Sequence, residues 1–253
     1  MNNILTRWRD YLLNEDVIRG RALEHYTTGL SRKIVNVLKE DEVRELIATK
    51  GEVDFELVAD ELLDDLDWVN SVVVNVSTSD YIDVVGSYEY STRASNEDRE
   101  DSDIIINIVI PVDFSDHDFS VLIPELKDTL RHELEHSSQS TDVLSNIDDV
   151  IPAEDDGHVW SSIESADRYY NSQSETEAHV AGLYKRAKML NKPASQVIDK
   201  FLDDILDMGT HYGHNENDVT KLISKIRKQW FDYLISRYPN ANIGNYGKFE
   251  PEQ

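Results

Sequence analysis

The sequence predicts an α+β fold, in which a small, mostly antiparallel sheet is flanked along the chain by N-terminal and C-terminal helices. Two observations lead to this prediction. β-Branched and aromatic residues concentrate between positions 68 and 114, whereas apolar residues recur at helical spacing before and after that region. Since the order is helices, then strands, then helices, the two kinds of element are segregated, as in α+β domains.

The first 45 residues are predicted to be helical. Two amphipathic runs indicate this, one over residues 4–12 and one from Val17 to Leu38. We therefore divide the chain into an N-terminal helical segment, residues 1–45, and a main domain with C-terminal helices, residues 46–253.

Three stretches predict strands. "WVNSVVVNVST" begins at Trp68, "YIDVVGSYEYST" begins at Tyr81, and "DIIINIVIPVDF" covers residues 103–114. The first two are β-branched or partly alternating, and the third is a continuous apolar run that is typical of a buried strand. We expect two or three strands that are antiparallel neighbours.

Helical periodicity returns at Ser120 and dominates the rest of the chain. It predicts further helices at 174–190, 194–208 and 217–237. The acidic run "NIDDVIPAEDDGH", residues 146–158, predicts a loop before them.

The composition excludes several kinds of site and partner. There is no cysteine, which excludes disulfides, thiolate zinc sites and a cysteine nucleophile. The chain has 50 acidic and 25 basic residues and a formal net charge of −25. This charge disfavours nucleic acid, because phosphate contacts need Lys and Arg, and it attracts divalent cations and basic peptides.

The chain shows no N-terminal apolar run of signal-peptide type and no apolar segment of membrane-spanning length. We expect a soluble protein, cytoplasmic or virion-associated, that binds neither nucleic acid nor membranes.

The stretch "LRHELEHSSQ" contains the pattern H-E-x-x-H, formed by His132, Glu133 and His136. Two histidines at positions i and i+4 lie on one helical face about one turn apart, so both imidazoles can bind one Zn²⁺ ion. Glu133 then points obliquely toward the water side of the ion. Zinc lowers the pKa of its bound water to roughly 7, and the carboxylate can take the proton during attack on a carbonyl.

The rest of this helix suits the motif. Leu126, Leu130 and Leu134 form one apolar stripe at about 100° per residue, and the two histidines lie well away from it. The helix can therefore bury its leucines and still present both histidines to a cleft.

A third metal ligand is available in "SETEAHVAGLYKRA". Glu175 shares a helical face with the small residues Ala178 and Gly182, which would let another helix approach closely. The alternative is helix capping, since both the Ser172–Glu175 and the Ser174–Glu177 spacings fit a capping box. We assign Glu175 as the ligand and Glu177 as a cap.

The motif His132-Glu133-x-x-His136, followed by Glu175-Thr-Glu-Ala178, resembles the gluzincin branch of the zincin metallopeptidases. The resemblance implies zinc-dependent hydrolysis of a peptide or protein substrate. It also implies that His132, His136 and Glu175 bind Zn²⁺ and that Glu133 is the general base.

The resemblance covers roughly residues 103–190. Within it, the strand at 103–114 is similar to the edge strand with which zincins pair extended substrates. The metzincin branch offers a competing third ligand, Asp142. That pattern requires a glycine where this chain has Gln139, and no convincing Met-turn follows.

Two further residues are candidates for the catalytic chemistry. His179 lies one turn after Glu175 and could orient a ligand or the substrate oxyanion. Tyr169 and Tyr170 precede the same helix, and we take Tyr170 as a candidate donor to a tetrahedral intermediate. The alternative for His179 is a polar surface or packing residue, and the alternative for Tyr170 is packing in the core.

The N-terminal run "ILTRWRDYLLNED" is similar to short helices on tailed-phage proteins, some of which are trimmed after a Leu-x-Glu triplet. Leu13-Asn14-Glu15 and Leu38-Lys39-Glu40 both fit that triplet. The alternative is an amphipathic helix that packs on the domain. A second functional hypothesis follows: a non-catalytic structural or interaction protein of a virion, in which the H-E-x-x-H helix is inert or only stabilised by metal.

Overall fold

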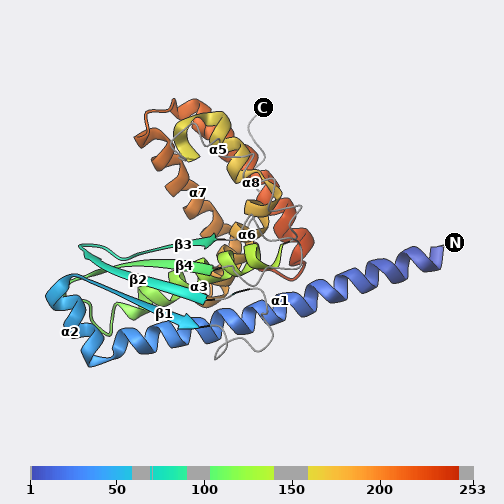
Figure 1. Cartoon of the computed structure of the whole chain (residues 1–253). Coiled ribbons are helices and arrows are strands. Elements are labelled where there is room, and N and C mark those ends of the chain that lie inside the picture. Colours follow the sequence, from blue (N-terminus) through green and yellow to red (C-terminus); the bar gives the residue numbers. More distant parts are fainter. Residues whose placement is uncertain (1, 59–68, 70, 90–102, 140–158, 245–253) are drawn as a thin grey trace. The chain divides into compact units, whose positions relative to one another are not determined.

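The computed structural model describes residues 2–244 except 59–68, 70, 90–102 and 140–158; for residues 2–19, 58 and 89 it describes the backbone alone (Figure 1). The chain forms two compact units, Met1–Leu134 and Glu135–Gln253. The boundary falls inside a helix, α3 (Phe119–Ser138).

The predicted α+β class is confirmed. The sheet has four strands, β1 (Glu52–Val58), β2 (Ser71–Ser79), β3 (Asp83–Glu89) and β4 (Asp103–Pro111), in the order β1-β2-β4-β3. The β1–β2 and β3–β4 pairs are antiparallel, whereas β2 and β4 are parallel. The sheet is thus mixed but mostly antiparallel.

Three details of the sheet differ from the sequence prediction. The predicted strands are not all antiparallel neighbours, because β2 and β4 are parallel and β2 does not pair with β3. Strand β1 was not expected, although its acidic residues are exposed and alternate with half-buried apolar ones. The expectation that 103–114 resembles an edge strand is wrong. β4 lies between β2 and β3, so its backbone is paired on both sides. In the described part of the chain, β3 lies at the edge of the sheet. A continuous apolar run indicates burial, and burial is greatest for an interior strand.

The first unit also contains α1 (Asn2–Lys39) and α2 (Asp41–Lys50), so the helical N-terminal region is confirmed and extends to residue 50. One core joins these helices, the sheet and α3. Alternate strand residues point into this core, as the two-residue strand period requires. Its fully buried members include Leu30, Ile34, Val74, Ile104, Ile106, Leu126, Leu130 and Leu134.

In its described residues, the second unit consists of helices and the turns between them, including a single-turn 3₁₀ segment, η3 (Val159–Ser161). The three predicted helices are confirmed as α6 (Gln173–Leu190), α7 (Ala194–His211) and α8 (Glu216–Arg237). A short helix, α5 (Ile163–Tyr170), was not expected. These elements enclose a second core. Among the described residues, no helix has the length and apolar composition needed to cross a bilayer.

Candidate metal centre

Helix α3 presents both histidines of the motif one turn apart, as the i, i+4 spacing requires. Leu126, Leu130 and Leu134 are fully buried, so the predicted apolar stripe anchors the helix in the core of the first unit. His136 is buried and His132 is half-buried. The division of this helix into a leucine face and a histidine face is therefore confirmed.

Helix α6 supplies the third side chain. Ser172 is its N-cap, and the Ser172 hydroxyl accepts a hydrogen bond of 3.2 Å from the backbone N–H of Glu175. This capping hydrogen bond therefore involves the backbone N–H of Glu175 and not its carboxylate. That carboxylate is buried, with 4% of the residue exposed.

The assignment of Glu177 as a cap is wrong. Ser172 rather than Ser174 begins the helix, which places Glu177 beyond the first turn. There its Oε1 accepts a hydrogen bond of 3.0 Å from Nε2 of Gln173, on the exposed face of α6. The two glutamates thus differ in environment although they are two residues apart.

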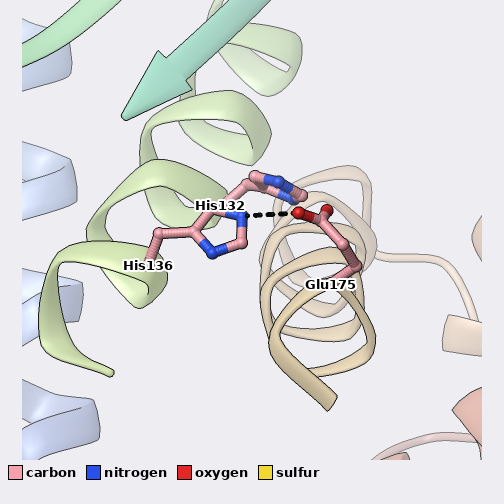
Figure 2. Close-up of side chains that lie close together, drawn as sticks. All are labelled: His132, His136 and Glu175. Carbon is pink, nitrogen blue, oxygen red and sulfur yellow. Dashed lines mark ion pairs between the residues drawn. The ribbon is translucent and has the colours of Figure 1, made fainter. Parts of the chain in front are cut away.

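The structure brings His132, His136 and Glu175 together. One ligand atom from each lies within 4.8 Å of the other two, and Oε1 of Glu175 is 3.4 Å from Nε2 of His136. Figure 2 shows the two imidazoles, carried by one helix, beside the carboxylate of the other helix.

This cluster fits a metal ion. Two imidazoles and a carboxylate form one of the ligand sets of catalytic zinc. Tetrahedral bonds of about 2.0–2.2 Å place ligand atoms roughly 3.3–3.6 Å apart, and the His136–Glu175 separation of 3.4 Å lies in this range. The predicted ligands thus form a buried group that can hold a metal ion.

Gln139 is a neighbour of the cluster that the sequence analysis did not identify as functional. It is buried and follows α3 directly. Its Oε1 lies 3.0 Å from Nδ1 of His136, and its Nε2 donates a hydrogen bond of 2.9 Å to the backbone carbonyl of Ser174. The i, i+3 spacing of His136 and Gln139 was a signal for their contact, whereas no spacing relates either of them to Ser174.

His179 lies beside Glu175, as predicted. Its Nε2 is 3.5 Å from Oε2 of Glu175, and its ring stacks on Trp230 with 4.9 Å between ring centroids. Burial, and secondarily the charge of His136, lower the pKa of His179 to about 3. The imidazole is therefore neutral near pH 7, enclosed by aromatic rings, and placed to orient the carboxylate.

Tyr170, at the end of α5, is buried against the ring of His179, with 5.8 Å between centroids. Burial, and then the charge of Glu175, raise the pKa of Tyr170 to about 12, while the neighbouring indole of Trp160 opposes this shift. Near pH 7 the phenol is therefore neutral and keeps its proton for donation.

Glu133 lies against strand β3. A Cβ atom added to Gly86 would lie 2.6 Å from Oε1 of Glu133 and 2.7 Å from Cγ2 of Thr129. The Thr129 hydroxyl donates a hydrogen bond of 3.1 Å to the backbone carbonyl of Val84. A side chain at position 86 would therefore have to displace Glu133 or Thr129, and this role of Gly86 was not predicted.

Asp142, the competing third ligand, lies outside the described residues, as does the acidic run at 146–158. The metzincin alternative thus stays open.

No protein-family model, no curated protein and no solved structure matches this chain.

Proposed function

We propose that this chain is a zinc-dependent peptidase in which His132, His136 and Glu175 bind Zn²⁺ and Glu133 is the general base. The observation that carries the proposal is the buried cluster itself. It joins both histidines of an H-E-x-x-H helix to a glutamate from a separate helix, and this ligand set is one that catalytic zinc uses.

Bound at this cluster, zinc would supply Lewis acidity, which acidifies water and polarises a carbonyl group. Glu133 would accept the proton of the attacking water and return it to the leaving amine. The contact between Glu133 and Gly86 supports this role, because it places the carboxylate beside the edge strand rather than in bulk solvent.

The same contact supports a peptide as substrate. We propose that β3, rather than β4, pairs with an extended peptide, because β4 already has a partner on each side. An edge strand offers a row of backbone donors and acceptors to an added strand. The net charge of −25 favours peptides with basic residues over acidic ones.

The test is to profile purified protein on a peptide library and to compare it with Glu133→Gln. We expect about one zinc per chain in both proteins, and a loss of cleavage of about 100-fold or more in the variant. Glu125→Gln, on the same helix, is the matched control and should cleave normally. Zinc-loaded wild type that cleaves no peptide would instead favour a metal-stabilised structural protein.

A further inference from the structure

We infer that Gln139 is a positioning residue that fixes both the tautomer of His136 and the placement of Glu175 relative to it. The inference rests on the proposed metal site, which it deepens. Gln139 is 2% exposed, and its amide lies between the side chain of one metal ligand and the backbone next to another.

The orientation of the Gln139 amide follows from its partners. The carbonyl of Ser174 can only accept a hydrogen bond, so the NH₂ group of Gln139 must face it. Oε1 therefore faces His136. Because Oε1 can only accept, Nδ1 of His136 must carry a hydrogen and donate it across the 3.0 Å separation.

This hydrogen bond determines what the other ring nitrogen can do. A neutral imidazole with its hydrogen on Nδ1 has a lone pair on Nε2. Nε2 faces Oε1 of Glu175 at 3.4 Å. Two electron-pair donors that face each other at this distance repel unless a cation lies between them. Gln139 thus holds His136 in the tautomer that presents a ligand atom, together with Glu175, to a metal.

The second hydrogen bond of Gln139 acts on the helices. Gln139 follows the last residue of α3, and Ser174 lies in the first turn of α6, directly before Glu175. One buried side chain therefore connects the end of the histidine helix to the start of the glutamate helix. Without the hydrogen bond from Gln139 to Ser174, the separation between Nε2 of His136 and Oε1 of Glu175 is less restrained.

The test compares Gln139→Leu, which removes both hydrogen bonds at similar volume, with Gln139→Glu, which keeps an acceptor for Nδ1. Zn²⁺ affinity is measured by competition with a chelator. The tautomer of His136 is read from nitrogen chemical shifts of metal-free protein in mildly alkaline solution. The control is Gln173→Leu on α6, since the hydrogen bond from Gln173 to Glu177 is exposed.

We expect Gln139→Leu to bind Zn²⁺ about 10–100-fold more weakly and to lose the preference for hydrogen on Nδ1. Gln139→Glu should keep the tautomer, and Gln173→Leu should match wild type in both measurements. Unchanged affinity in a folded Gln139→Leu protein would overturn the inference. If Gln139→Leu does not fold, the Gln139→Glu variant provides the test. Loss of the Nδ1-protonated tautomer of His136 in that variant would contradict the proposed role of Gln139. Wild type that binds no Zn²⁺ refutes the proposed function separately, since the tautomer is measured without metal.

Discussion

The backbone of Gly86 lies so close to Glu133 that any larger residue would collide with it. An added Cβ atom would be 2.6 Å from Oε1 and 2.7 Å from Cγ of that side chain. Such separations are well inside van der Waals contact, where a carbon pair prefers about 3.5–4.0 Å. The edge strand and the proposed general base therefore constrain each other.

Gly86→Ala should impair peptide cleavage without removing zinc. The added methyl group must displace either β3 or the Glu133 carboxylate, whereas the three proposed ligands lie on α3 and α6. We expect a loss of at least about tenfold in kcat/KM and a stability cost of about 1–3 kcal/mol from overpacking. Peptide kinetics and metal analysis of the purified variant provide the measurement.

Ser87→Ala is the matched control for Gly86→Ala. Ser87 is the next residue of β3, and its side chain is exposed. This change should leave cleavage and zinc content as in wild type. A Gly86→Ala protein that cleaves peptides at the wild-type rate would show that Glu133 does not depend on β3.

The local part of the site could be predicted from the sequence. The spacing of His132 and His136 places both side chains on one face, because residues four apart in an α-helix lie about one turn apart. The leucine stripe was equally predictable, since its period is that of a helix buried on one side. The small residues after Glu175 likewise indicated which face of α6 is buried. The start of α6 was not predicted correctly, because the capping boxes at Ser172 and Ser174 overlap and Glu177 was taken as the cap.

The non-local part could not be predicted in the same way. The apolar run of β4 indicates burial, but it does not say which strands pair with it, because pairing depends on contacts between distant segments. The contact of Gln139 with Ser174 and that of Gly86 with Glu133 could not be predicted either, because each joins residues that are distant in the sequence. A glycine within a strand indicates a close backbone approach, yet it does not name the residue that approaches.

Glu175→Ala and Ser172→Ala should separate the two roles at the start of α6. Ser172→Ala removes the hydroxyl that caps the helix and should cost about 1 kcal/mol, with zinc affinity retained. Glu175→Ala keeps the capping N–H and removes the carboxylate. Zinc affinity should then fall by more than the 10–100-fold typical of residues around a metal site. Chelator competition and thermal melts on both variants measure the two effects.

Asp142→Ala tests the competing ligand. If Glu175 binds zinc, Asp142→Ala should leave the affinity nearly unchanged. A metzincin-like site predicts the reverse, with a large loss for Asp142→Ala and little for Glu175→Ala. Zinc affinity retained in Glu175→Ala would refute the assignment of the third ligand.

Removal of metal should lower the stability of the protein. Zn²⁺ that binds only the folded chain adds about 2.7 kcal/mol when its concentration is 100 times Kd. A chelator should therefore lower Tm in wild type, and added Zn²⁺ should restore it. In Glu175→Ala the chelator should change Tm little, because the buried carboxylate no longer contributes a ligand. Equal chelator effects in both proteins would point to metal bound elsewhere.

Two glycines in helices should respond oppositely to alanine. Gly29 in α1 is exposed, and an added Cβ meets no atom within 4 Å. Gly29→Ala should therefore stabilise the protein by roughly 0.5–1 kcal/mol, because alanine loses less conformational entropy in a helix. In α7, a Cβ on Gly209 would lie 2.7 Å from the indole ring of Trp160.

That indole cannot move away easily. Trp160 is 3% exposed, and its backbone carbonyl lies 2.9 Å from Nε2 of His214. We therefore expect Gly209→Ala to destabilise the protein by about 1–3 kcal/mol through overpacking. Urea unfolding followed by circular dichroism and tryptophan fluorescence measures both changes. A stabilised Gly209→Ala protein would mean that α7 and Trp160 are packed less tightly than this contact requires.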